Sequence, residues 1–174
     1  MGEPKRLDSL PVFPSPPSPG DYGGWRLNVD GLVSRPLTFG YDEIRSMPST
    51  DLTADFKCEE GWEVQGLCWT GVPLDHLIKL AGPLKEARYV AVGSGEFVAS
   101  LALSDIELAQ PLLSYLLDGS PLLWEHGGPL RLVLADGSCY QSVKWVDRLK
   151  LAADTRMETA KRVALARIGR QEES

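Results

Sequence analysis

Hydrophobic and polar residues alternate over several short stretches of the chain, which is the pattern of half-buried β-strands. Residues 25–33 alternate on both sides of Asp30-Gly31, a turn dipeptide, and predict two short strands joined at that point. From Leu52 to Cys58 every second residue is apolar or small. Because alternate residues of a strand face the same way, Cys58 is expected at the end of a strand, on its buried face.

The second half of the chain predicts further strands. Residues 88–101 predict a hairpin that turns at Gly93-Ser94-Gly95, and three apolar stretches predict strands at 112–117, 130–134 and 143–151.

Short helices are predicted between these strands. Residues 41–47 form one helix, which Pro48 ends, and residues 70–81 form another, with Pro73 in its first turn and Gly82-Pro83 after its end.

Two more helices are predicted from their first residues. Ser104 and Glu107 have the spacing of a capping box and open a helix that ends near Pro111. Asp154 caps a last helix, which has an apolar inner side. The residues of that side are Met157, Ala160, Ala164 and Ile168.

Many strands with few, short helices indicate an α+β fold and exclude a doubly wound α/β fold. Five prolines between residues 11 and 19 predict an extended segment. We therefore divide the chain into a proline-rich N-terminal segment (1–20), one domain (21–153) and a C-terminal helix (154–174).

Composition narrows the functional classes. A net charge of −6 argues against a nucleic-acid-binding protein, and the absence of 18 consecutive apolar residues argues against a membrane span. The first 20 residues lack the apolar stretch of a secretion signal, so a cytoplasmic location is expected. Three cysteines, an odd number, argue against a disulfide framework.

Several common catalytic motifs are missing from the sequence. There is no glycine-rich phosphate loop, no G-x-S-x-G nucleophile motif and no C-x-x-C pair. The only histidines are His76 and His126, which is a poor set of ligands for zinc, and His76 is expected on the solvated side of its helix.

Two segments concentrate residues that could carry chemistry. The first reads FKCEEGW at 56–62 and continues as WTGVPL at 69–74. The second reads EHGGPLRLV at 125–133 and continues as SVKW at 142–145. Together with WRL at 25–27, VDGLV at 29–33 and RPL at 35–37, they resemble the sulfite oxidase-type molybdopterin-binding family, in the order and spacing of that family.

The resemblance implies a β-rich sulfite-oxidase molybdopterin-binding fold, with mixed sheets and short helices, and a molybdenum–molybdopterin cofactor. It implies that Cys58 is the thiolate ligand of the metal, for which soft sulfur is suited. Glu60 and Trp62 would shape the substrate side as catalytic-site residues. The other reading of Cys58 is a buried free cysteine.

The resemblance also assigns residues to the pterin and its phosphate dianion. His126, Arg131 and Lys144 would hold the phosphate, because an anion needs positive partners. Backbone N–H groups at Ser142 and Val143 would add to them. Ser94 would lie near the pterin, and Phe13 would belong to a segment that covers the cofactor. In the other reading, Arg131 and Lys144 form surface ion pairs. Arg131, however, lies between Leu130 and Leu132 on an apolar strand, where a charge needs a buried partner or an anion.

The sequence departs from the family at two places. Where sulfite oxidases carry arginines after the cysteine, this chain has Glu59 and Glu60, so sulfite is a poor substrate and the chain is closer to the branch of the methionine sulfoxide reductase catalytic subunit. Cys139 and Gln141 replace a glycine and a lysine of the phosphate loop, for which Arg148 or Lys150 could compensate.

We expect an oxidoreductase that transfers an oxygen atom to or from a small substrate, such as an S-oxide or N-oxide, and exchanges electrons with a separate redox protein. Two alternatives stay open: a carrier or pseudo-enzyme that binds molybdopterin without turnover, and an interaction module on the same fold without cofactor.

Overall fold

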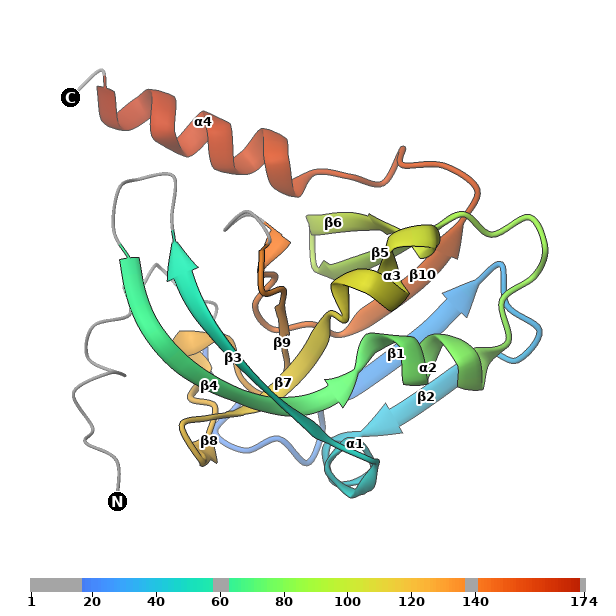
Figure 1. Cartoon of the computed structure of the whole chain (residues 1–174), viewed down its shortest axis with the longest axis horizontal. Helices are drawn as coiled ribbons and strands as arrows, with labels where there is room; N and C mark the ends of the chain where they lie inside the picture. Colours follow the sequence, from blue (N-terminus) through green and yellow to red (C-terminus); the bar gives the residue numbers. More distant parts are fainter. Residues whose placement is uncertain (1–16, 58–62, 137–140, 173–174) are drawn as a thin grey trace.

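The computed structural model describes residues 17–57, 63–136 and 141–172, and two sheets form its framework (Figure 1). The first sheet has the order β2-β1-β10-β5-β6, in which β1 and β10 are parallel and the other pairs antiparallel. Its strands are β1 (Arg26–Gly31), β2 (Leu37–Gly40), β5 (Tyr89–Ser94), β6 (Phe97–Ala102) and β10 (Arg148–Ala152).

The second sheet has the order β3-β4-β7-β8, and β9 pairs with β7. All of its strand pairs are antiparallel. Its strands are β3 (Thr50–Lys57), β4 (Glu63–Pro73), β7 (Leu112–Leu117), β8 (Ser120–Pro121) and β9 (Arg131–Val133). β3 and β4 form a long, curved hairpin in Figure 1.

The helices are short and connect or flank the strands, apart from the last one. They are α1 (Tyr41–Ser46), α2 (Leu74–Ala81), α3 (Leu103–Ala109), the 3-10 helix η2 (Trp124–His126) and α4 (Ala160–Glu172). Among the described residues, no helix is long and apolar enough to cross a membrane. The α+β class and its mixed sheets are as predicted from the sequence.

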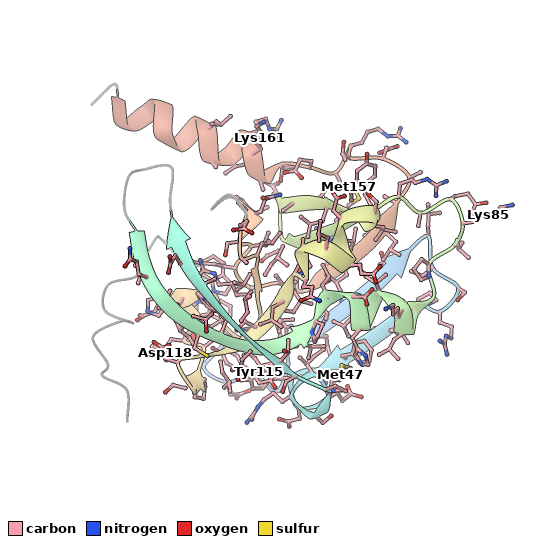
Figure 2. All side chains as sticks on the ribbon, in the orientation of Figure 1. Met47, Lys85, Tyr115, Asp118, Met157 and Lys161 are labelled. Carbon is pink, nitrogen blue, oxygen red and sulfur yellow. The ribbon has the colours of Figure 1, made fainter. Side chains whose placement is uncertain are left out.

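Two hydrophobic clusters lie on opposite faces of the second sheet. The larger one lies between the sheets and joins Leu27 and Leu149 of the first sheet to Leu113 of the second. Side chains fill this space in Figure 2, whereas Lys85 and Lys161 project outward. The smaller cluster lies on the other face of the second sheet, because neighbouring strand residues point to opposite sides. It contains Ala54, Val64, Leu67, Trp69, Leu112, Leu117, Leu122 and Val133.

The strand β3 follows the predicted alternation. Ala54 is buried, Leu52 packs against the smaller cluster, and Thr53 and Asp55 are exposed. The pairing of β3 with β4 shifts between Ala54 and Phe56. Cys58, Glu60 and Trp62, which the sequence assigns to the metal and the substrate, lie outside the described residues, in the connection from β3 to β4.

Two predictions for the first sheet were wrong because of close backbone contacts. Asp30-Gly31 does not join two strands but ends β1, and a Cβ on Gly31 would lie 2.2 Å from the Leu151 carbonyl oxygen. The glycine therefore permits close packing of β1 on β10 and is not a hairpin turn. The strand predicted at 143–151 begins only at Arg148, since Trp145 has a positive φ of 53° that interrupts an extended chain.

The predicted helix limits were wrong at three places. Residues 70–73 continue β4, because pairing with β7 outcompetes the local helix signal, and α2 begins at Leu74. Ser104 is not a cap but lies inside α3, where its hydroxyl donates to the Asp105 carboxylate. Asp154 likewise accepts bonds from Arg156 and precedes α4 by six residues.

The predicted helix at 41–47 and the hairpin at 88–101 are confirmed.

Candidate molybdopterin site

Arg131 is the most buried charged residue among those described, with 4% of its surface exposed. It lies at the start of β9, which pairs with β7, and it alternates with Val133 so that both face the smaller cluster. Its guanidinium carbon lies 5.3 Å from the centre of the Trp69 ring, which belongs to the same cluster. The indole face therefore stabilises a buried positive charge at this position.

Two hydrogen bonds fix the plane of the Arg131 guanidinium. Nη1 donates to the His126 carbonyl oxygen at 2.8 Å, and Nε donates to Ser142 Oγ at 3.2 Å. Ser142 in turn donates to the carbonyl oxygen of Leu132 at 2.9 Å. A guanidinium carries five N–H donors in one plane, so these two bonds also determine the direction of the others.

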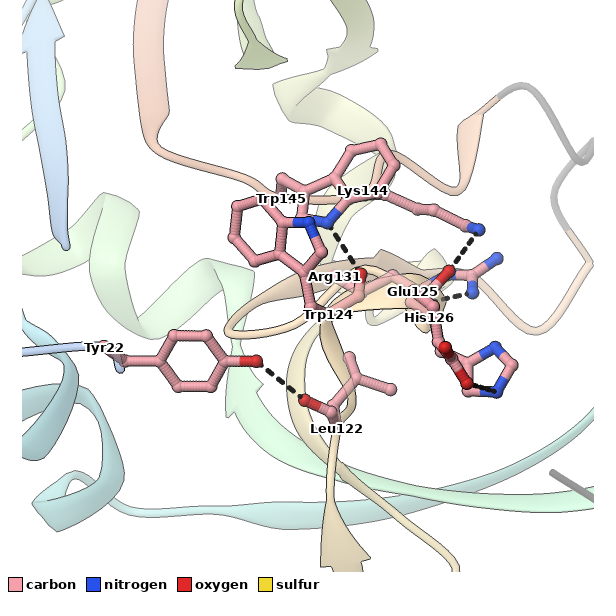
Figure 3. A network of polar contacts seen from close by, with 8 residues as sticks. All are labelled: Tyr22, Leu122, Trp124, Glu125, His126, Arg131, Lys144 and Trp145. Carbon is pink, nitrogen blue, oxygen red and sulfur yellow. Dashed lines mark hydrogen bonds and ion pairs between the residues drawn. The ribbon is translucent and has the colours of Figure 1, made fainter. Parts of the chain in front are cut away.

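Lys144 lies beside Arg131, on the segment that follows the undescribed residues 137–140. Its Nζ donates to the Glu125 carbonyl oxygen at 3.0 Å and lies 5.6 Å from the centre of the Trp145 ring. In Figure 3, the Lys144 and Arg131 side chains extend to the same side of the chain segment that both contact. Two cations that the sequence separates by 13 residues thus form one positive centre.

The segment that both cations contact is a tight turn of residues 122–126, which includes η2 and is called the 122–126 turn below. Every carbonyl oxygen of the turn accepts a hydrogen bond. Tyr22 Oη donates to the carbonyl of residue 122, and the His126 and Gly128 amides donate to that of residue 123. The carbonyl of residue 124 accepts from the Gly127 amide and from Trp145 Nε1. Lys144 Nζ donates to the carbonyl of residue 125, and Arg131 Nη1 to that of residue 126. The conformation of the turn and the position of the cations are therefore linked.

Gly127 allows Lys144 to pack directly over the end of this turn. Its φ is +102°, in the left-handed region, and a Cβ there would lie 2.7 Å from Lys144 Cγ. Its carbonyl oxygen accepts a hydrogen bond from the Trp145 amide at 3.0 Å. The glycine of the H-G-G-P segment thus lets the backbone at the end of the turn lie directly against the segment that carries Lys144.

His126 is 3% exposed, and its Nε2 lies 3.8 Å from Glu125 Oε1. The structure therefore brings together four residues that the sequence assigns to the phosphate: His126, Arg131, Ser142 and Lys144. Val143 is adjacent, with its side chain buried, and its N–H donates to the Gln141 carbonyl oxygen.

Ser94 lies at the end of β5, in the other sheet. The neighbouring Gly93 carbonyl oxygen accepts a hydrogen bond from the Asp147 amide, three residues beyond Lys144. The turn that carries Ser94 is therefore attached through the backbone to the segment that carries Lys144.

Sequence reasoning assigned no role to three aromatic residues of this region: Tyr22, Trp69 and Trp124. Trp69 lies under Arg131, Trp124 packs on Trp145 with 5.7 Å between ring centres, and Tyr22 contacts the first carbonyl of the 122–126 turn. Trp69 is the first residue of the WTGVPL segment and Trp124 directly precedes the EHGGPLRLV segment, and these positions were the only signal for them. Tyr22 is 100 residues from its partner and gave none.

Among the described residues, no group of three histidine, cysteine or acidic side chains is placed to hold a metal ion. The described part of the site instead contains two cations, Arg131 and Lys144, held by backbone carbonyls and a serine hydroxyl.

The profile of the family described as "Oxidoreductase molybdopterin binding domain" matches residues 15–160, so the chain belongs to this family. The predicted family resemblance is thereby confirmed.

Relatives of two kinds are similar to the chain. "Uncharacterized oxidoreductase YuiH" of Bacillus subtilis is 33% identical over 127 residues, which are 72% of this chain and 64% of that protein. "Putative protein-methionine-sulfoxide reductase subunit YedZ1" of Azospira oryzae is 29% identical over 130 residues, 74% of this chain and 49% of that one. The crystal structure of the sulfane dehydrogenase SoxCD from Paracoccus pantotrophus superposes with a TM-score of 0.69 and 28% identity, over 77% of this chain and 39% of that one. The chain therefore spans less than two thirds of each of these proteins.

Proposed function

We propose that this protein is a molybdenum cofactor-dependent oxidoreductase that transfers an oxygen atom to or from a small substrate, such as an S-oxide or N-oxide. The observation that carries the proposal is the positive centre made by buried Arg131 and by Lys144 at the 122–126 turn. Two cations held by neighbouring carbonyls of one turn attract an anion more strongly than either cation alone.

The donor set at this centre fits a phosphate ester. Arg131 and His126 would donate N–H groups to the phosphate, Lys144 would add a point charge, and the backbone N–H of Ser142 would add a further donor. Val143 would place the segment through its buried side chain and through its carbonyl oxygen, which accepts the Leu132 amide. Ser94 would approach the pterin from the β5–β6 turn.

The metal would be held at the other end of the ligand. We assign Cys58 as its thiolate ligand, and Glu60 and Trp62 to the substrate side of the site. The strand that leads to Cys58 contributes Ala54 to the same cluster that contains Trp69, on the face to which Arg131 belongs, and this shared face supports the assignment.

When bound, the cofactor would supply two-electron oxygen-atom transfer, and the chain would orient it, fix its charge and restrict access to it. Electrons would be exchanged with a separate redox protein. A cytoplasmic location and the division into residues 1–20, 21–153 and 154–174 remain predictions.

The test is molybdenum analysis of protein made in a host that synthesises the cofactor. We expect about one molybdenum per chain, lost in Cys58→Ala and retained in Cys68→Ala. Cys68, on β4 and half-buried, is the matched control. Wild-type protein with molybdenum should then reduce an S-oxide with a reduced viologen dye. Stoichiometric molybdenum without turnover would favour a carrier, and wild-type protein that never contains molybdenum would contradict the proposal.

A further inference from the structure

A tyrosine far from the site in sequence contacts the first residue of the turn that holds the two cations. Tyr22 Oη donates to the Leu122 carbonyl oxygen at 3.3 Å (Figure 3). It reaches the 122–126 turn from the side opposite to Lys144 and Arg131. We propose that Tyr22 is a positioning residue that fixes the 122–126 turn and, through it, the Lys144 and Arg131 side chains. The part of this inference that concerns ligand binding rests on the proposed function.

The fit around the Tyr22 hydroxyl is tight. A Cβ on Gly128 would lie 2.8 Å from Tyr22 Oη and 2.1 Å from the Leu122 carbonyl oxygen. The hydroxyl therefore occupies the space beside this glycine, between the two ends of the turn. The Gly128 amide donates to the Leu123 carbonyl oxygen at 2.9 Å, so the turn closes on itself around this point.

The Tyr22 ring is held independently of the turn. It packs edge-on against Tyr41, with 5.1 Å between ring centres, and Tyr41 also packs against Trp25 at 6.4 Å. The guanidinium carbon of Arg45 lies 5.5 Å from the centre of the Tyr41 ring. Because aromatic packing and a cation fix the ring cluster on α1, the Tyr22 hydroxyl has a rigid support from which to hold the turn.

The turn transmits this position to the cations because its carbonyls are bonded in series. The Leu122 carbonyl accepts from Tyr22, and the Leu123 and Trp124 carbonyls accept from backbone amides of residues 126–128. The Trp124 carbonyl also accepts from the indole N–H of Trp145 at 2.7 Å. The next two carbonyls hold Lys144 and Arg131. A change in the orientation of the first peptide therefore alters the acceptors of both cations.

Burial supports this role for Tyr22. Desolvation, with a smaller contribution from Tyr41, raises the pKa of the Tyr22 phenol above its ordinary value, so it stays protonated and able to donate at neutral pH.

The test compares Tyr22→Phe with Tyr41→Phe, which removes a hydroxyl from the same aromatic cluster but not the one that donates to Leu122. The first readout is hydrogen exchange of the Trp145 indole N–H, measured by NMR, since that group donates into the turn. We expect exchange to be about two- to tenfold faster in Tyr22→Phe, the effect of one hydrogen bond, and unchanged in Tyr41→Phe. Equal exchange in wild type and Tyr22→Phe would overturn the inference.

The second readout is the affinity for inorganic phosphate, measured by NMR titration of the same cofactor-free proteins. We expect the dissociation constant to rise by about two- to tenfold in Tyr22→Phe only. Faster exchange with unchanged phosphate affinity would overturn the link from Tyr22 to the cations. Wild-type protein that binds no phosphate at Arg131 and Lys144 would count against the proposed function, whereas the exchange comparison would still decide whether Tyr22 fixes the turn.

Discussion

Replacing Arg131 by methionine tests whether its charge serves the turn, the ligand or both. Methionine keeps much of the length and the packing on Trp69, but it removes the bonds to the His126 carbonyl oxygen and to Ser142. Ser142 still donates to the Leu132 carbonyl oxygen, so the acceptor that chiefly loses its charged partner is the His126 carbonyl.

The expected magnitude follows from opposing contributions. A bond from a charged donor contributes about 1.5–3 kcal/mol, and a buried cation–π contact contributes up to about 2 kcal/mol. Burying the guanidinium costs several kcal/mol, and methionine avoids this cost. We expect a net loss of about 1–3 kcal/mol in the free energy of unfolding of the cofactor-free protein, which lowers Tm by about 2–12 °C. We expect cofactor affinity to fall by about 10-fold or more, because charge-assisted bonds to the phosphate are lost.

The assays are urea unfolding of the cofactor-free protein and molybdenum content after expression in a cofactor-competent host. Arg88→Met is the matched control, because Arg88 also donates to two backbone carbonyls, those of Lys85 and Ala87, but is exposed. Unchanged unfolding of Arg131→Met would refute its role in the turn. Molybdenum equal to that of wild type would refute its role in binding the ligand.

Two other substitutions make separate predictions. Gly127→Ala should destabilise the protein by about 1–3 kcal/mol and reduce molybdenum content, because φ is +102° and the new Cβ would meet Lys144 Cγ. The control is Gly119→Ala, where φ is +80° and the space around the new Cβ is open. This control should reduce stability in urea unfolding but leave molybdenum content unchanged. Desolvation raises the pKa of the Asp147 carboxyl above 3.8, although the Arg148 charge opposes the shift. The folded state therefore binds this proton more tightly than the unfolded chain does. The resulting stabilisation is fully present below pH 3.8 and is lost as the pH rises through the folded-state pKa. Asp147→Asn should therefore have a higher Tm than wild type at pH 7, a difference that shrinks toward pH 3, whereas a constant difference would contradict this reasoning.

The fold class could be predicted from the sequence because strand alternation depends on burial, which the whole sheet imposes. The alternation of residues 52–55 and the apolar stretch 112–117 correspond to observed strands. Errors occurred where a local signal competed with a tertiary contact. The turn signal of Asp30-Gly31 arises from a glycine that packs on Leu151, and the helix signal of residues 70–73 yields to pairing with β7. Such contacts cannot be inferred from neighbouring residues in the chain.

The described part of the candidate site was predictable to the extent that its residues violate the pattern around them. Arg131 stands between two leucines on an apolar strand, and this anomaly correctly marked a buried charge. The partners that make this burial possible were not predictable, since Trp69 and the His126 carbonyl come from other parts of the chain. Tyr22 carries no anomaly at all, because a tyrosine after a proline-rich segment is unremarkable in a sequence.

In the proposed function, Arg131 and Lys144 would bind both the 122–126 turn and the phosphate, so the stability of the turn would be linked to ligand binding. In that function, the side chains that donate to the His126 and Glu125 carbonyls would donate to the anion as well. If the anion binds only when both cations are in place, the coupling is reciprocal. The anion then stabilises the folded turn by the same free energy by which the folded turn strengthens anion binding. Substitutions that loosen the turn should therefore weaken phosphate binding even where the substituted residue, like Tyr22 or Gly127, carries no charge.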